Sequence, residues 1–182
     1  MLFVCALVFI YSLGLSTDLY DSLYSTMMDP EDLSSTTVAG SRIYYDIQPF
    51  NTAFTNVSIG LILVTLILFV TQTHARRKYY IGNFVSVALS AVCNIAASVW
   101  ACANIMAYRS EFKNGVDFEA LKSHSELWKT YYTESTFWFD VSIVIFGLLL
   151  LVTVLLVANL ILKMIVMKEE KRLIGQRKEV SA

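Results

Sequence analysis

Long stretches without charge divide the sequence into segments that can cross a membrane. No Asp, Glu, Lys or Arg occurs in residues 47–75, 79–108 or 141–162. A bilayer core about 30 Å thick needs roughly 20 apolar residues as helix, so these stretches predict membrane-spanning helices at about 54–73, 80–107 and 138–162. Hydrophobic residues make up 56% of the chain and charged residues 16%. This is more apolar surface than a soluble domain of this size needs for its core.

The N-terminal segment is a fourth candidate span. Residues 1–17, MLFVCALVFIYSLGLST, precede the first charge at Asp18 and come close to the lower length limit for a span. A cleaved signal peptide is the alternative, since Gly14 and Ser16 are spaced like a cleavage site, although no basic residues precede the apolar run. With this span retained, the sequence predicts an all-α membrane protein, with residues 1–182 folded as a single four-helix transmembrane bundle.

Basic residues are unevenly distributed between the two sides that this topology creates. The connection 74–79 and the segment from Lys163 onward contain nine Lys and Arg residues, whereas segments 18–53 and 109–136 contain five. Positive residues favour the cytoplasmic side, so both termini and the tail 163–182 are expected in the cytoplasm. The two longer loops then face outward or into a lumen. Plasma membrane and intracellular vesicle satisfy the same counts.

The two outer loops differ in pattern. The first, 18–53, is acidic and ends in SRIYYDIQPF, a short β-prone segment that Pro49 closes. The second contains GVDFEALKSHSELWKTYY, in which Asp117 is a suitable N-cap. Its apolar residues recur at helical spacing and form one stripe: Phe118, Leu121, Trp128 and Tyr131 or Tyr132. The second loop is therefore predicted to be partly helical and to lie at the membrane surface.

The third predicted span carries many small and polar side chains. They recur at steps of three or four residues and share one helix face: Asn83, Ser86, Ser90, Asn94, Ala97, Ala101 and Asn104. In lipid, close packing and interhelical hydrogen bonds drive helices together, so this face is predicted to hold the bundle together or to bind a partner's transmembrane helix. A pore or substrate pathway is the alternative, which would add charged residues in the membrane interior.

Two further polar residues fall within the fourth span. Asp140 lies one turn from its outer end and is either a proton or cation site or an interfacial residue bonded to a neighbouring helix or water. Asn159 lies deeper in the span and is expected to make an interhelical bond. The two residues together form a possible intramembrane polar site.

The sequence offers no arrangement of residues that favours catalysis or cofactor binding. His74 and His124 fall on opposite sides of the membrane in this topology, so they cannot share a metal or haem within one chain. Cys5, Cys93 and Cys102 lie in predicted spans, which leaves the outer loops without a disulfide framework and argues against tetraspanins, claudins and connexins. We expect a protein that is not an enzyme and has no cofactor, metal, nucleic-acid partner or small-molecule substrate.

Two predicted spans and a basic connection resemble segments of a known family. FVSVALSAVCNIAASVWACANIMAY (84–108) resembles the third span of MARVEL-domain proteins, the synaptophysin and synaptogyrin branch among them. SIVIFGLLLLVTVLLVANLIL (142–162) is similar in character to their fourth span, and the connection HARRKYY also fits. The resemblance covers roughly residues 50–165, without the outer-loop cysteines of the synaptophysin branch. It implies a four-helix bundle in trafficking vesicles or zones of membrane apposition, with a role in organisation and partner binding.

The sequence as a whole predicts an integral membrane protein that works through the lipid bilayer and through self-association or a membrane-protein partner. Three roles stay open. The first is a MARVEL-like organiser of membranes, and the second is an accessory subunit of a larger channel, pump or respiratory assembly. The third is a small channel or transporter, which would need a hydrated path joining Asp140 to the polar face of the third span.

Overall fold

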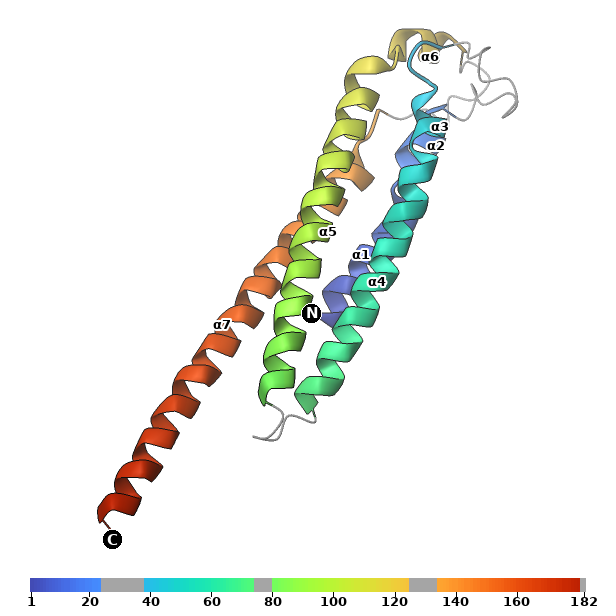
Figure 1. The fold of residues 1–182 in the computed structure, drawn as a ribbon. Coiled ribbons are helices and arrows are strands. Elements are labelled where there is room, and N and C mark those ends of the chain that lie inside the picture. Colours follow the sequence, from blue (N-terminus) through green and yellow to red (C-terminus); the bar gives the residue numbers. More distant parts are fainter. Residues whose placement is uncertain (24–37, 74–79, 125–133, 181–182) are drawn as a thin grey trace.

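The computed structural model describes residues 1–23, 38–73, 80–124 and 134–180, and the regular structure in these ranges is entirely helical (Figure 1). The all-α prediction is confirmed for this part of the chain. In chain order the elements are α1 (Leu2–Gly14), α2 (Thr17–Leu23), α3 (Ile43–Asp46), α4 (Gln48–Thr73), α5 (Tyr80–Gly115), α6 (Phe118–His124) and α7 (Phe137–Val180).

Four helical stretches are long and apolar enough to cross a membrane. They are Leu2–Leu23, Ile43–Gln72, Ile81–Gly115 and Phe137–Gln176, and each overlaps one predicted span. The helices run further than the predicted boundaries, because those boundaries followed apolar composition whereas backbone hydrogen bonding continues through polar residues. By the length and composition of its helices, the chain is a multi-pass integral membrane protein.

The bundle helices pack as a ring in which each contacts two neighbours. Both α1 and α5 pack against α4 and against α7, so α1 lies across the ring from α5. Consecutive bundle helices run antiparallel (Figure 1). Beyond the ends of α4 and α5, α7 continues as one helix into the predicted tail, which begins at Lys163.

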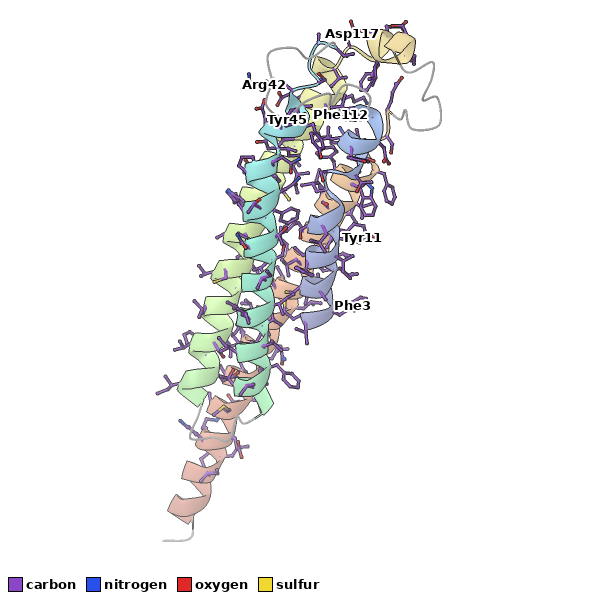
Figure 2. The ribbon with its side chains drawn as sticks, turned by 90° about the vertical axis from the view of Figure 1, so that its right-hand side faces the viewer. Phe3, Tyr11, Arg42, Tyr45, Phe112 and Asp117 are labelled. Carbon is purple, nitrogen blue, oxygen red and sulfur yellow. The ribbon has the colours of Figure 1, made fainter. Side chains whose placement is uncertain are left out.

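The bundle exposes many large apolar side chains on its outer surface, in addition to those that form its core. In Figure 2, Phe3 points away from the helices, and it is 73% exposed. Other exposed apolar residues along the spans include Leu63, Phe69, Val92, Val99, Leu151 and Val154. Buried residues include the polar Ser58, Thr65, Ser90, Asn94, Ser98 and Thr153. Contiguous apolar surface of this extent is unfavourable in water but matches lipid, where small and polar residues drive helix packing.

Three short helices, α2, α3 and α6, gather at one end of the bundle, which we call the cap end (Figure 1). Phe112 of α5 forms the centre of this region, with its ring centroid 5.4 Å from that of Phe118 in α6 and 6.2 Å from that of Phe139 in α7. Ile43 and Leu121 are buried in the same core. The cap end is therefore packed continuously with the bundle.

Segment 41–50, which the sequence predicts as β-prone, is helical, so that prediction is wrong. Isolated strands have no ladder partner to satisfy their backbone groups, whereas here the chain forms α3 and then enters α4. Pro49 does not close the segment but lies in the first turn of α4, where its fixed φ and missing N–H are tolerated.

Helix α6 lies at the start of the loop that precedes α7. Asp117 Oδ1 accepts a hydrogen bond from the Ala120 N–H at 3.0 Å, as expected of an N-cap. Phe118 packs against the core and Leu121 is buried in it. The remaining residues of the predicted stripe, Trp128, Tyr131 and Tyr132, lie outside the described residues.

The two loops at the cap end contact each other at Gly40. This residue has φ of 80° and lies directly against the end of α5, since a Cβ added there would stand 2.1 Å from the Gly115 carbonyl oxygen. Next to it, the Asp117 N–H donates to the Ala39 carbonyl oxygen at 3.0 Å. Both the backbone conformation and the close approach require glycine.

We predict that Gly40→Ala detaches this contact. The left-handed conformation alone costs roughly 1–2 kcal/mol for other residues, so the melting temperature in mild detergent should fall by about 4 °C or more. Gly82→Ala is the matched control, because a Cβ there meets nothing within 4 Å and alanine favours helix. An unchanged melting temperature for Gly40→Ala would show that this contact does not stabilise the fold.

Candidate functional site

The polar face predicted on the third span lies mostly inside the chain's own bundle. Six of its residues are buried: Asn83, Ser86, Ser90, Asn94, Ala97 and Ala101. The seventh, Asn104, is half-buried and donates from Nδ2 to the carbonyl oxygen of Trp100 on the same helix, at 2.8 Å. Of the two uses predicted for this face, the burial favours packing within the bundle.

Asn94 is the centre of this face and joins α5 to α7. Its side chain is fully buried, and Nδ2 donates to Thr153 Oγ1 at 3.0 Å. The same nitrogen lies 3.4 Å from the Met1 sulfur. One turn further along α1, Cys5 Sγ lies 3.3 Å from Thr65 Oγ1 of α4. Cys5, Thr65, Asn94 and Thr153 thus form a layer, here called the central polar layer, to which each bundle helix contributes one residue.

A second polar contact joins α4 to α5 at the end opposite the cap. Thr71 Oγ1 lies 2.9 Å from Ser86 Oγ, and Ser86 donates to the Asn83 carbonyl oxygen. Leu68, Val87 and Leu160 form a small apolar cluster in this part of the bundle. Hydrogen bonds of this type between helices in lipid contribute about 0.6 kcal/mol on average.

The polar face also contains atoms that the described residues leave without a hydrogen-bond partner. Ser90 Oγ and Asn94 Oδ1 are buried and unpaired, as is Asn83 Oδ1. A buried unpaired acceptor or donor costs about 1–3 kcal/mol. The face therefore contains more polar atoms than its hydrogen bonds use.

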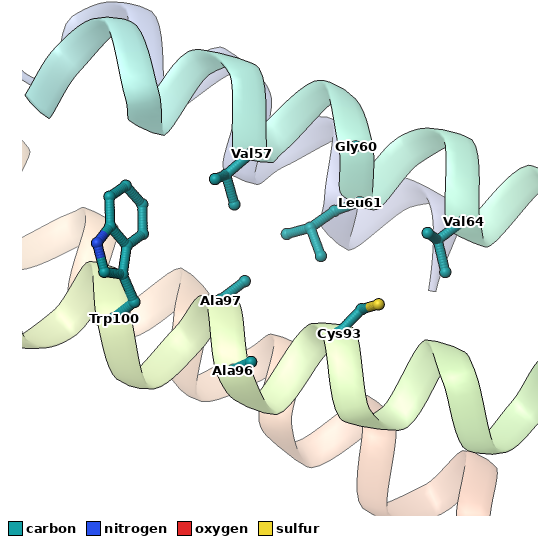
Figure 3. A pocket seen from close by; sticks show the side chains of 8 residues that line it. All are labelled: Val57, Gly60, Leu61, Val64, Cys93, Ala96, Ala97 and Trp100. Carbon is teal, nitrogen blue, oxygen red and sulfur yellow. The ribbon is translucent and has the colours of Figure 1, made fainter.

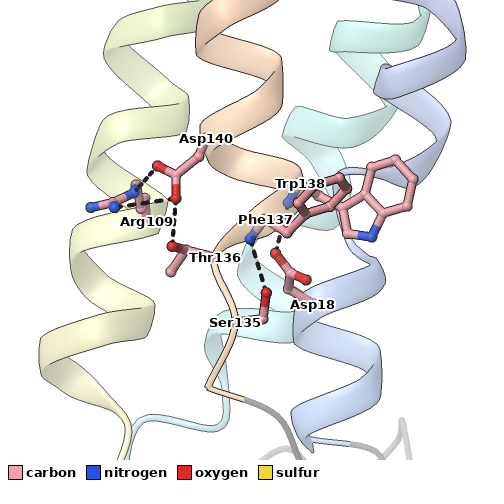
Figure 4. Close-up of polar contacts among 7 residues, drawn as sticks. All are labelled: Asp18, Arg109, Ser135, Thr136, Phe137, Trp138 and Asp140. Atoms are coloured by element: carbon pink, nitrogen blue, oxygen red, sulfur yellow. Dashed lines mark hydrogen bonds and ion pairs between the residues drawn. The ribbon is translucent and has the colours of Figure 1, made fainter.

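Asp140 is bonded to a neighbouring helix, which was one of its two predicted roles. Arg109 of α5 donates to it from Nε at 2.7 Å and from Nη2 at 3.3 Å, and the Thr136 hydroxyl donates at 2.7 Å (Figure 4). The Arg109 and Asp140 side chains are 33% and 48% exposed, and ion pairs with this exposure contribute at most about 1 kcal/mol. The two parallel hydrogen bonds between the Arg109 guanidinium and the Asp140 carboxylate nevertheless fix the rotation of α5 against α7 at the cap end.

Asp18, which the sequence pattern marks only as a charge of the first loop, has a structural role. It is 4% exposed, and its Oδ2 accepts a hydrogen bond from the Trp138 N–H at 2.9 Å (Figure 4). The first N–H groups of a helix have no partner within that helix, and a carboxylate there also interacts favourably with the helix dipole. Asp18 therefore caps α7 from the other end of the sequence. Trp138 in turn packs on Tyr11, with ring centroids 5.4 Å apart.

Asn159 does not make the predicted interhelical bond within the part of the chain that the structure describes. Its side chain is exposed on α7, between positions with exposed Leu155 and Leu162 one turn to either side. The intramembrane site predicted with Asp140 is not assembled either, because Asp140 lies at the cap end and Asn159 lies one turn before Lys163, toward the opposite end of the span.

The remaining candidate chemistry is disulfide formation by cysteine and metal binding by histidine. Cys5, Cys93 and Cys102 are all free thiols. The described residues contain no group of three His, Cys, Asp or Glu side chains that could hold a metal ion. His74 lies outside the described residues.

Comparisons with family models, with curated proteins and with solved structures return no match.

We predict that Asn94 and Thr153 are energetically coupled. Asn94→Leu and Thr153→Val each remove one side of their hydrogen bond, and a double-mutant cycle should return a coupling of about 1 kcal/mol, within the range measured between membrane helices. The measurement is unfolding in mixed micelles followed by helical content. A coupling near zero would mean that the two side chains do not bond, and Asn104→Leu, paired with Thr153→Val, is the control cycle.

We also predict that Asp18→Ala lowers the free energy of unfolding by about 1 kcal/mol, the usual effect of losing a helix cap. Asp18→Asn should retain most of the stability, because its amide oxygen can still accept from the Trp138 N–H. Asp21→Ala, on the same short helix, is the matched control. Equal stability of the Asp18→Ala and Asp21→Ala variants would contradict the capping role.

Proposed function

We propose that this protein is a non-enzymatic membrane organiser that binds other membrane proteins, or further copies of itself, through helix contacts within the bilayer. Its own four helices form the stable unit. The outward face of α7 around Asn159 is the contact surface. In this proposal the polar face of α5 maintains the bundle and does not bind the partner.

The exposed side chain of Asn159 carries the proposal. It lies in the charge-free stretch 141–162 among exposed apolar side chains, where an amide facing hydrocarbon leaves its hydrogen-bonding groups unsatisfied. Amides in this position drive association between transmembrane helices and contribute about 1–2 kcal/mol in simple peptides. A partner helix that pairs with Asn159 would remove this cost.

The distribution of charge supports an orientation for the bundle. Lys163 Nζ donates to Gln72 Oε1 near the end of α4 at 3.3 Å, and Lys168, Lys171 and Arg172 follow on the extension of α7, which runs away from the cap end. Because Lys and Arg flanking a span favour the cytoplasmic side, we propose that this extension is cytoplasmic and that the cap end faces outward or into a lumen. The resemblance to MARVEL-domain spans favours vesicle or plasma membranes.

The accessory-subunit role remains the first alternative, and it uses the same face of α7. The two roles differ in the partner: an organiser associates with itself or with several proteins, whereas a subunit co-purifies with one larger partner at fixed stoichiometry. For a small channel or transporter, ion flux in reconstituted vesicles is the deciding measurement.

We predict that Asn159→Leu weakens association about tenfold, the equivalent of 1.4 kcal/mol. The measurement is the native mass of the tagged protein in mild detergent, with its co-purifying proteins identified. Asn159→Gln keeps an amide and should restore association, and the Asn94→Leu variant should lose stability without losing the partner. A wild-type protein that is monomeric and alone would refute the proposed function, whereas unchanged association of Asn159→Leu would refute this face.

A further inference from the structure

A heptad pattern runs along the outward side of α7. Steps of four and three residues alternate along one stripe, which we call the α7 seam: Leu148, Val152, Leu155, Asn159, Leu162, Val166, Glu169 and Leu173. All of these residues are exposed except Val152, which is half-buried. A repeat with an average step of 3.5 residues is typical of helices that pack side by side as a coiled coil.

Asn159 occupies a position that holds a single polar residue in many coiled coils. In heptad notation, leucine fills the d positions of the seam within the span, and valine lies on either side of Asn159 at the a positions. Valine at a with leucine at d favours two parallel helices, and one Asn at an a position specifies the register and the number of helices. The seam therefore has the pattern of a two-stranded contact.

A second copy of the chain provides the complementary surface. Two copies inserted with the same topology run parallel, so their Asn159 side chains lie at the same depth in the membrane. An amide contains both donors and acceptors, and two Asn159 side chains can therefore bond each other instead of facing hydrocarbon unpaired. Such a contact has two-fold symmetry, in which both copies use the same residues.

The length of α7 determines which helix of a second copy meets the seam. Leu173 is 58% exposed on the extension of α7, which runs beyond the ends of α4 and α5 (Figure 1). In the part of the chain that the structure describes, α7 alone reaches this level. A parallel neighbour can therefore cover Leu173 only with its own α7. From Leu148 to Val166 the seam extends about 27 Å at 1.5 Å per residue, nearly the thickness of the bilayer core, about 30 Å.

Glu169 is the one charged residue of the seam. It lies beyond the charge-free stretch 141–162, and its Oε2 lies 3.3 Å from Arg172 Nη2 on the same helix. Because both side chains are more than half exposed, water and Arg172 reduce the repulsion between two Glu169 carboxylates. Leu173 then continues the apolar pattern one turn further along α7.

We propose that a second copy of this chain docks on α7 through a parallel α7 seam, in which the two Asn159 side chains hydrogen-bond to each other. The inference rests on the proposed function, because it names the partner of the α7 face. It also assigns the orientation of that partner and the residues that it covers.

The groove between α4 and α5 is a less suitable surface for a second copy. It has a volume of about 380 Å³, and its lining residues include Val57 and Gly60 of α4 and Ala96 and Trp100 of α5 (Figure 3). No amide or charged side chain lines it, so it contains no group comparable to Asn159 that would specify the rotation of a docked helix.

The test is disulfide cross-linking of the full chain, diluted in phosphatidylcholine vesicles and oxidised with iodine. Each variant carries one added cysteine, and mass spectrometry identifies the linked peptides, which separates them from those of the native thiols. We expect about tenfold more cross-linking between copies of Leu155→Cys or Leu162→Cys than of Val154→Cys or Ile161→Cys, equivalent to 1.4 kcal/mol.

The four positions form two matched pairs. Neighbouring residues differ by about 100° around a helix of 3.6 residues per turn but lie at nearly the same depth. Leu155 and Val154 are 60% and 64% exposed, and Leu162 and Ile161 are 61% and 47% exposed. Accessibility alone therefore predicts similar cross-linking within each pair, whereas docking through the seam predicts a difference.

Asn159→Leu, added to the Leu162→Cys variant, should lower cross-linking about tenfold, because apolar side chains do not prefer a protein neighbour to lipid. Asn159→Gln keeps a donor and an acceptor and should retain most of the cross-linking. Asn104→Leu is the matched control, since it removes a half-buried amide of α5 and should leave the cross-linking unchanged.

Four results would overturn the proposal. Equal cross-linking at the four positions would show random collision. Stronger cross-linking of Val154→Cys and Ile161→Cys, or of Ala96→Cys beside the groove, would show that copies meet through another face. No cross-linking, together with a different protein that co-purifies only when Asn159 is present, would refute the second copy and leave the proposed function intact. A chain that is monomeric and alone would refute both.

Discussion

The absence of water in the bilayer core is the constraint on which the architecture depends. A polar group placed there either forms a hydrogen bond with another group of the protein or remains without a hydrogen bond. The chain meets this constraint with the central polar layer, in which Asn94 bonds Thr153 and Cys5 lies against Thr65. These contacts join α5 to α7 and α1 to α4, so they act between helices where the hydrophobic effect offers no preference for one arrangement over another. The remaining unpaired atoms, such as Ser90 Oγ, show that the constraint is not met completely.

The cap end is stabilised by different interactions, because its polar groups have access to the membrane–water interface. Apolar burial around Phe112 holds α5, α6 and α7 together. The polar contacts there position the helices relative to one another. Arg109 pairs with Asp140 between α5 and α7, and Asp18 caps the start of α7. The loop at Gly40 is pressed against the end of α5. The cap thereby fixes both the rotation and the axial position of the helices that continue into the membrane.

These two regions hold several polar side chains in contacts within the chain. The face of α5 that the sequence predicts for helix contacts is buried against α7 and α4. The outward surface is apolar apart from positions such as Asn159, and it is indented between α4 and α5 at Gly60 and Ala96.

The candidate spans, the helical class and the polar face of α5 can be predicted from the sequence alone. Charge-free runs located four helices, although α5 continues to Gly115 and α7 to Val180, beyond the predicted ends at 107 and 162. A repeat of three to four residues placed Ser86, Ser90 and Asn94 on one side of α5. Asp117 was identified as a cap because its partner lies three residues away. The tertiary structure decided which helix each face meets. Periodicity gives the direction of a side chain around its own helix axis but contains nothing about the rotation or order of neighbouring helices. For this reason Thr153 as the partner of Asn94, Asp18 as the cap of α7, the outward direction of Asn159 and the groove at Trp100 emerge only when the four helices are packed together.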